Sequence, residues 1–465
     1  MNKLLSLLSL EKREIKLLIY SILLVFLLFA AYAFLRPIRD ALGIEKGTQE
    51  LKWLFLGTFI ATLICSLLAM NLSGIIRRKL YADGIFIFFA LNLMAFYVAM
   101  LLIQKDSPYY IWLCRTFFIW VSVFNLFVIS TAWSILADTY TRERSARLFG
   151  IISAGASVGS IIGSMWVGFL GHKIATQHFI LLSGLFLFAS LILKNLMIKE
   201  SYQLLTENQQ SQFLQKFNTP LPAKNPFTGI KIVFQSNYLM LLALFIILLT
   251  SVSTFLYMEQ ARIVKTAFEN REARTAFFAK IDFVVQTASF IIQIFLTAKI
   301  AKHFGSKSLL SLLGFVLAFG FIVLIVSNHA LWAIIVVYSL RRVGEYALVK
   351  PAREMLFVPL DGESKYKVKN FTDTVVYRGG DALSSQLEGF LADKNANYAL
   401  IAGGVLALLW GFVGLKLSRK YENQEVVSSE QFFRQSCGLT DIFLITLRYC
   451  FRQPENTLYR LSCHI

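Results

Sequence analysis

The segment LLVFLLFAAYAFLRPIRDALGIEKG, from Leu23 to Gly47, decides how this chain must fold. It begins as an apolar run and then carries Arg36, Arg39 and Asp40 with no polar linker before them. About 20 apolar residues in a helix, at roughly 1.5 Å each, cross a hydrocarbon core of roughly 30 Å. The segment therefore predicts a membrane span whose end holds charges, and those charges need something to face.

The composition extends this interpretation to the whole chain. Of its 465 residues, 56% are hydrophobic and 16% are charged, whereas a soluble protein carries about 25% charged residues. We expect an all-α polytopic membrane protein. The net charge of +18 is typical of loops that set membrane orientation, so we expect no nucleic-acid partner. The five cysteines show no metal-ligand spacing, and neither a metal site nor a cofactor is predicted.

The apolar segments predict twelve transmembrane helices in two six-helix pseudo-repeats. The predicted spans lie at 17–35, 53–75, 85–103, 109–137, 147–170, 178–198, 238–257, 277–298, 308–326, 331–358, 371–391 and 398–416. The chain then divides into an N-terminal bundle at 1–198, a cytoplasmic central loop at 199–237, a C-terminal bundle at 238–420 and a cytoplasmic tail at 421–465.

The distribution of Lys and Arg predicts the orientation. These residues are more frequent in the segments on the side of the N-terminus, which places both termini in the cytoplasm and the chain in the inner membrane. On the other side they concentrate in the loops after the first and seventh spans, which are equivalent positions in the two halves. This concentration indicates a purpose other than topology.

The tenth span, LWAIIVVYSLRRVGEYALVKPAREMLFVPL, contains several charges although a charge at mid-bilayer costs at least roughly 2.5–3.5 kcal/mol. Arg341 and Glu345 are four residues apart, as are Lys350 and Glu354, so each pair can meet on one helix face. Arg342 has no partner in its own helix. Pro351 removes a backbone hydrogen bond and predicts a kink.

Two further spans carry polar stripes. In the eleventh span the stripe contains Asp373, Tyr377, Asp381, Ser384 and Glu388, and Arg378 lies three residues before Asp381. In the eighth span Asp282 begins a second polar face with Gln286, Ser289 and Gln293. The seventh span ends with Glu259, Arg262 and Lys265, which the duplication makes the counterparts of the charges that end the first span.

Taken together, these positive groups predict a binding site for a small anion. The expected substrate-binding residues are Arg36, Arg39, Arg262, Lys265, Arg341, Arg342, Lys350 and Arg378. The expected counter-charges, or coupling residues if a proton is carried as well, are Asp40, Asp138, Glu259, Asp282, Glu345 and Asp381. Two alternatives remain open at this point: arginines near helix ends snorkel to lipid headgroups, and internal ion pairs can simply hold helices together.

The two halves and the basic loops resemble the major facilitator superfamily. Its glycine-bearing basic loop is similar to TAKIAKHFGSKSLL, through Gly305 and Lys307, and LSGIIRRKLYADG keeps the basic cluster. A narrower resemblance is to the bacterial and plastid ATP/ADP (nucleotide) translocases. LRPIRDALG is similar to the end of their first span, with Arg39 in place of a lysine, and STAWSILADTYTRERSARLFG is similar to the exit of their fourth span. The matching positions there are Trp133, Asp138, Ala146, Arg147 and Phe149.

The resemblance implies a secondary transporter, expected to be a monomer, that moves an anion such as a nucleotide or another phosphorylated metabolite by alternating access. Antiport and proton symport both stay open. The alternative is a membrane-embedded enzyme acting on a lipid or envelope precursor, but the sequence has no HExxH or Gly-x-Ser-x-Gly motif to carry such chemistry, and no catalytic residue is assigned.

Overall fold

The computed structural model describes residues 11–171, 173–220, 229–295, 297–357, 360 and 362–436, and the side chains of 296–308 lie outside the described set. The basic loop with Gly305 and Lys307 is therefore not described at the side-chain level. The first half contains η1 (Lys12–Glu14), α2 (Ile15–Gly43), η2 (Thr48–Glu50), α3 (Leu51–Ile75), α4 (Arg78–Leu102), α5 (Pro108–Thr139), α6 (Arg142–Leu170) and α7 (Thr176–Gln203). The connecting segment holds α8 (Glu207–Asn218) and α9 (Gly229–Gln235).

The second half repeats this pattern with α10 (Asn237–Ala267), α11 (Arg271–Phe295), α12 (Thr297–Val326) and α17 (Ala396–Ser436). Its other two membrane segments are interrupted: α13 (Leu331–Gly344), η4 (Glu345–Val349) and α14 (Lys350–Met355) form one, and α15 (Gly362–Phe371), η5 (Thr372–Val376) and α16 (Tyr377–Lys394) form the other. Both η4 and η5 are π-helical turns. A π-helical turn lies just before Pro351, the position where the sequence predicts a kink.

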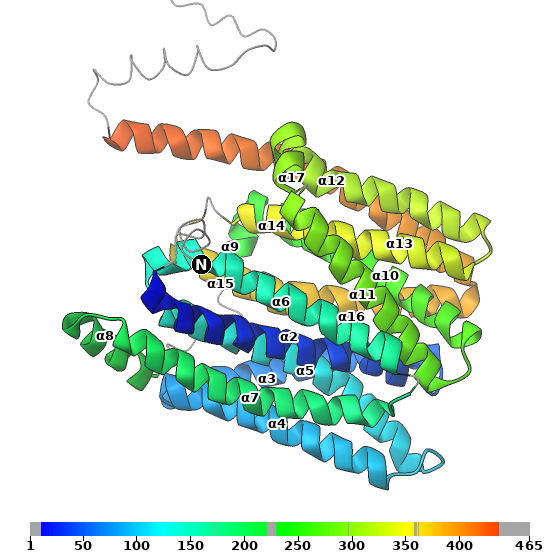
Figure 1. The fold of residues 1–465 in the computed structure, drawn as a ribbon. Helices are drawn as coiled ribbons and strands as arrows, with labels where there is room; N and C mark the ends of the chain where they lie inside the picture. The colour runs from blue at the N-terminus through cyan, green and yellow to red at the C-terminus, as the bar shows by residue number, and fades with distance from the viewer. Residues whose placement is uncertain are drawn as a thin grey trace, which may run out of the picture.

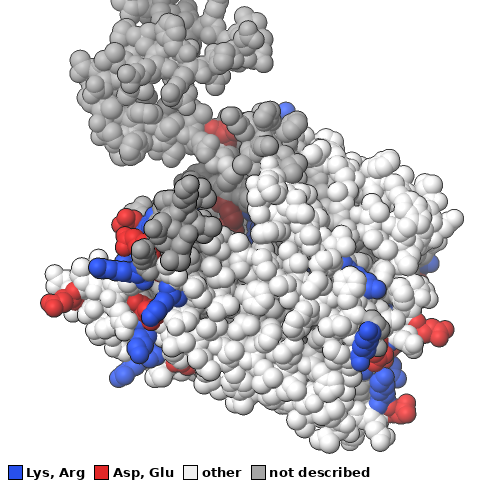
Figure 2. Space-filling view, in the orientation of Figure 1, with Lys and Arg blue, Asp and Glu red and all other residues white. Residues whose placement is uncertain are grey.

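Among the described residues, ten helices are long and apolar enough to cross a membrane by length and composition, and the two interrupted segments complete the predicted twelve. The predicted fold class is therefore confirmed. In Figure 1 the helices lie side by side, with the first half in blue to green beside the second half in green to orange. Charged side chains gather at both ends of the face seen in Figure 2, and a broad uncharged band separates them. Such a band fits the hydrocarbon core of a bilayer.

The two halves are built alike. In the first, α2 packs against α5, α6 and α7; in the second, α10 packs against α13, α16 and α17. The halves meet where α6 contacts α11 and where α3 contacts α16, which again are equivalent pairs. The duplication expected from the sequence therefore determines the packing, and each half has its own apolar core.

One end of the bundle joins the two halves by charged contacts. We call it the latch face; the opposite end, with η1, α8 and α9, is the terminal face. The contacts between the halves at the latch face are Lys52 with Asp393 (2.8 Å), Arg274 with Glu45 (2.8 Å), Lys105 with Glu272 (3.7 Å), and Lys265 Nζ with the Glu45 carbonyl oxygen (2.8 Å). Apolar residues of the first half, including Leu51 and Phe118, also pack there into the core of the second half. In this conformation the halves are closed together at the latch face.

The helix ends differ from the prediction in two informative places. The first span was expected to stop near residue 35, but α2 continues to Gly43 with Pro37 inside it. Arg36, Arg39 and Asp40 therefore lie within the helix. Their charges are tolerated there because the side chains face protein and not lipid. The last span also runs on as α17 to Ser436, into the region assigned to the tail.

Gly159 allows the close approach of α6 to α2. A Cβ atom placed there would come 2.3 Å from the carbonyl oxygen of Phe26, whereas a Cβ at Gly150 on the same helix meets nothing within 4 Å. We therefore expect Gly159→Ala to lower the free energy of unfolding by about 1–3 kcal/mol, as overpacking does, because backbone cannot yield as a side chain can. Thermal unfolding in detergent measures this, and Gly150→Ala is the matched control. Equal midpoints for the two variants would contradict this account of the α2–α6 contact.

Candidate functional site

Asp282 of α11 lies between two arginines from different helices. The Arg342 side chain of α13 donates through Nη1 to Asp282 Oδ1, and Nε of Arg36 on α2 lies 3.8 Å from Asp282 Oδ2. Arg342 is 1% exposed and Asp282 is 4% exposed. We call these three residues the central triad. Because Arg36 belongs to the first half and the other two to the second, the triad joins the halves in the protein interior.

The π-helical turn η4 brings a phenol to this triad. The wider turn follows α13 directly and carries Tyr346, whose hydroxyl accepts from Arg36 Nη1 at 3.3 Å. The Arg342 guanidinium carbon lies 5.8 Å from the Tyr346 ring centre and 5.7 Å from that of Tyr338. The two arginines are thus held by aromatic rings as well as by Asp282, which fixes their orientation.

The charges within the central triad do not balance. Arg39, Arg341 and Arg378 each have a carboxylate partner, namely Asp40 (2.6 Å), Glu345 (2.6 Å) and Asp381 (3.7 Å). Arg36 and Arg342 share the single carboxylate of Asp282. In addition, Nε of Arg36 and both Nε and Nη2 of Arg342 are buried without a hydrogen-bond partner. Unused, buried and positively charged donors are costly, and they are the groups that an anion satisfies.

A second bridge between the halves lies next to the triad. Asp40 of α2 accepts from the Tyr257 hydroxyl of α10 at 2.9 Å, and it also holds Arg39. The Arg39 guanidinium lies 5.2 Å from the ring centre of Phe118 and 3.5 Å from the Ser122 hydroxyl. Arg36 and Arg39 therefore do not snorkel; both turn into the protein, and their side chains are each 14% exposed.

The polar stripe of the eleventh span faces α10. Asp381 accepts from the Thr254 hydroxyl at 3.0 Å, Ser384 lies 2.7 Å from the Ser251 hydroxyl, and Glu388 accepts from Arg262. The predicted pair Arg341 and Glu345 is confirmed, and Arg341 also donates to Ser253 of α10. The predicted pair of Lys350 and Glu354 is wrong, because Glu354 binds Lys369 of α15 while Lys350 is exposed.

Some predicted site residues lie away from the triad. Arg262 is bound by Glu259 and Glu388, and Lys265 lies on the latch face, so the structure does not bring these counterparts of Arg36 and Arg39 to the same place. Asp138 is at the terminal face, where it holds Arg78 of α4 at 2.5 Å and Lys216 of α8 at 2.9 Å. It ties the connecting segment to the first half.

The structure also gives roles to three cations outside the predicted anion site, Lys52, Arg271 and Arg274, and a different role to Lys265, which was predicted to bind substrate. Four cations after the first and seventh spans, Lys52, Lys265, Arg271 and Arg274, each contact the opposite half. In the sequence, these cations could be recognised by their concentration in two equivalent loops, which indicated a purpose other than membrane orientation. The structure shows that they close the latch face. Their partners Asp393 and Tyr110 have no distinguishing sequence pattern.

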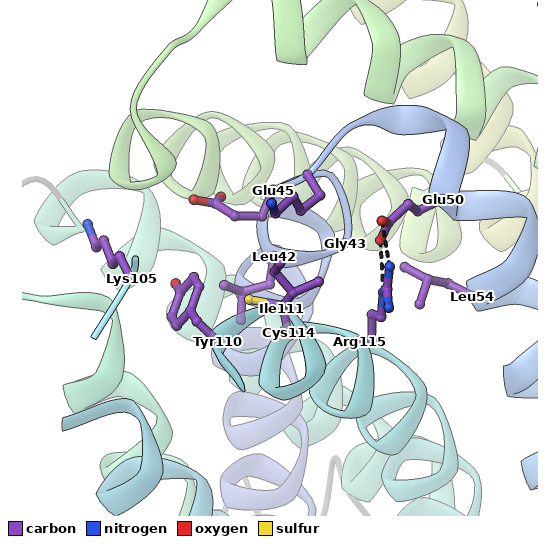
Figure 3. A pocket seen from close by; sticks show the side chains of 11 residues that line it. Leu42, Gly43, Glu45, Glu50, Leu54, Lys105, Tyr110, Ile111, Cys114 and Arg115 are labelled. Atoms are coloured by element: carbon purple, nitrogen blue, oxygen red, sulfur yellow. Dashed lines mark hydrogen bonds and ion pairs between the residues drawn. The ribbon is translucent and has the colours of Figure 1, made fainter. Parts of the chain in front are cut away.

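The latch face also holds a pocket of about 180 Å³, shown in Figure 3. Glu45 enters it from the end of α2, Tyr110 and Cys114 from α5, and Arg115 donates to both oxygens of Glu50 at 3.0 and 2.7 Å. The Glu50–Arg115 pair lies within the first half, between η2 and α5.

Comparison with known proteins agrees with this architecture. The sequence profile of the Major Facilitator Superfamily matches residues 17–349. Similar solved structures include a peptide transporter POT in complex with sulfate, at 14% identity over 88% of this chain and 95% of that chain, with a TM-score of 0.61. The nucleoside transporter NupG gives 13% identity over 89% and 99%, with a TM-score of 0.53. The inward-open xylose transporter XylE from E. coli gives 12% over 86% and 95%, with a TM-score of 0.54. No curated protein sequence matches the chain.

The architecture of two related bundles around buried charges is that of a secondary transporter and not of an enzyme. The chain belongs to the Major Facilitator Superfamily.

Asp282 gives a direct test of the central triad. We expect Asp282→Asn to lower the free energy of unfolding by roughly 3–5 kcal/mol, because it leaves two buried guanidinium groups without a counter-charge. The control is Glu354→Gln, which breaks the more exposed pair with Lys369 and is expected to cost about 0–1 kcal/mol. Thermal unfolding of both variants in detergent compares them. If they lose equal stability, the triad does not carry the charge balance described above.

Proposed function

We propose that this transporter carries a small anion, bound between Arg36 and Arg342. The single observation that carries the proposal is that these two interior arginines share one carboxylate and keep three nitrogens without a hydrogen bond, Nε of Arg36 and both Nε and Nη2 of Arg342. An anionic oxygen would accept from these nitrogens and supply the missing negative charge. In the empty site, Asp282 would partly compensate the two positive charges and reduce their mutual repulsion until the substrate binds.

Binding at this place would couple substrate to conformation. Arg36 belongs to α2 and Arg342 to α13, so an anion that contacts both joins the two halves. Substrate binding then favours the states in which the halves approach at the centre, and the latch face is free to open in the others. The second bridge, from Asp40 to Tyr257, would break and form with the same movement.

The surroundings favour an organic anion. Tyr338 and Tyr346 lie beside Arg342, and Phe55 packs against Tyr257 at a centroid distance of 5.5 Å. Rings of this kind accommodate the carbon skeleton of a metabolite while the arginines hold its phosphate or carboxylate. A nucleotide fits this description, and its assignment rests on the sequence resemblance to the ATP/ADP translocases. The distribution of Lys and Arg supports an inner-membrane protein whose terminal face is cytoplasmic.

Uptake into proteoliposomes tests the substrate class. The panel contains labelled nucleotides, a sugar phosphate, inorganic phosphate, and neutral and cationic metabolites. We expect saturable uptake of an anion, and a fall of about ten- to a hundred-fold in kcat/KM for Arg36→Gln and for Arg342→Gln, because a hydrogen bond to a charged group contributes roughly 1.5–3 kcal/mol. Arg115→Gln is the control. Uptake of none of the anions, or full activity in both site variants, would contradict the proposal.

Alternating access predicts that the latch must open in each cycle. In a background without the native cysteines, Lys52→Cys with Asp393→Cys places a thiol on each half, and a short thiol cross-linker is expected to abolish transport until it is cleaved. The control pair, Glu50→Cys with Arg115→Cys, lies within one half, and its cross-link should leave transport intact. Transport that continues through a complete Lys52–Asp393 cross-link would rule out this movement.

A further inference from the structure

Two buried carboxylates share one arginine in the second half, apart from the central triad. Arg262 Nη2 donates to Glu259 Oε2 at 2.7 Å and also to Glu388 Oε1. Glu259 is 1% exposed and Glu388 is 0% exposed. With both carboxylates ionised, the group carries one uncompensated negative charge in the protein interior, which is costly.

Two observations indicate where a proton would bind to compensate the extra negative charge of Glu259, Glu388 and Arg262. Oε2 of Glu388 is buried and has no hydrogen-bond partner. The ring of His329 lies between two side chains, with Nδ1 2.5 Å from Glu259 Oε1 and Nε2 3.1 Å from the Asn397 side-chain amide. A neutral imidazole donates to Glu259 through one nitrogen and accepts from the Asn397 amide through the other, and it then adds no positive charge. One added proton, on the imidazole or on a carboxylate, removes the uncompensated negative charge of the group.

The backbone holds His329 in this place. Asn328 and His329 have φ values of 53° and 59°, in the left-handed region that residues other than glycine rarely adopt. A hydrogen bond from the His329 amide to the Leu324 carbonyl, at 3.0 Å, maintains the turn. The His329 side chain is 28% exposed, so it connects the buried carboxylates with the latch face. Backbone strain of this kind persists where the surrounding structure requires a particular side-chain position.

We propose that Glu259, His329 and Glu388, arranged around Arg262, form a proton-binding site that couples transport to a proton gradient. The inference goes beyond the anion site, since it concerns the coupling ion. Glu388 lies on α16, and the same helix holds the latch: Gln386 donates to the Lys52 carbonyl oxygen at 2.9 Å, and Asp393 binds the Lys52 ammonium. Protonation weakens the hold of Arg262 on α16, and the latch then opens more readily.

Other charges near the site are already engaged. Lys52 of α3 is paired with Asp393, and Lys265, one turn beyond Arg262, donates to the carbonyl oxygen of Glu45. Asn397 of α17 is neutral. Within the described part of the chain, the shared proton therefore falls to His329 and the two glutamates.

The experiment uses the full chain in detergent with no substrate, so its failure is distinct from failure of the anion proposal. Cross-linking rates of the Lys52→Cys/Asp393→Cys pair are divided by those of the Glu50→Cys/Arg115→Cys pair, which cancels the pH dependence of thiol chemistry. Between about pH 7.5 and about pH 5.5, we expect the ratio to fall about threefold or more. Glu388→Gln should make the ratio low at both pH values.

Infrared difference spectra between the same pH values report proton binding directly. We expect the carbonyl-stretch signal of a protonated carboxylic acid in the wild-type protein, and its loss in Glu259→Gln or Glu388→Gln. His329→Gln, at the surface, keeps the test available if a buried variant fails to fold, and Glu50→Gln is the control. A pH-independent cross-linking ratio, or an infrared signal and a pH response that survive in all three site variants, would overturn the proposal.

Discussion

The interior of this protein depends on one electrostatic constraint at Asp282. A single carboxylate, 4% exposed, must compensate Arg36 from one half and Arg342 from the other. In a low-dielectric interior, two guanidinium groups with one counter-charge leave a net positive charge that water cannot screen. The surrounding phenols and the second bridge through Asp40 and Tyr257 moderate this charge without removing it. An anion that enters between the halves does remove it, so the same deficit that is costly in the empty protein favours substrate binding.

The duplicated architecture places this uncompensated positive charge between the two halves, where an anion can bind both. α2 and α10 occupy equivalent positions in the two bundles, and each contributes one side of the Asp40–Tyr257 bridge. The π-helical turns η4 and η5 interrupt the second-half equivalents of α5 and α6, which are themselves continuous, so the second half has departed from the symmetry. One of these turns presents Tyr346 to the arginines. The first half thus supplies Arg36, and the second half supplies Asp282, Arg342 and the π-helical turn that carries Tyr346.

The sequence was sufficient for the class of fold, because span length, composition and loop charge report directly on the bilayer. Local charge pairs three or four residues apart were also predictable, as Arg341 with Glu345 and Arg378 with Asp381 show. The partners of Arg342 and Arg262 were not, because they come from other helices and depend on how those helices rotate. Helix rotation also explains why Arg262 binds Glu388 and does not join Arg36, although duplication placed the two at equivalent positions. The predicted Lys350–Glu354 pair is wrong for a related reason: Glu354 instead binds Lys369 of α15, a partner from another helix that spacing within one helix cannot predict.

The central claim is that an excess positive charge at Arg36 and Arg342 selects an anion. Ligand-dependent thermal unfolding of the purified protein across a series of metabolites, with net charge as the variable, tests this claim most directly. The account predicts that the midpoint rises with phosphorylated or carboxylated compounds in a saturable manner, and that the rise disappears when Arg342 is replaced by glutamine. Stabilisation by cationic or neutral compounds alone, or an undiminished rise in the Arg342→Gln protein, would contradict it.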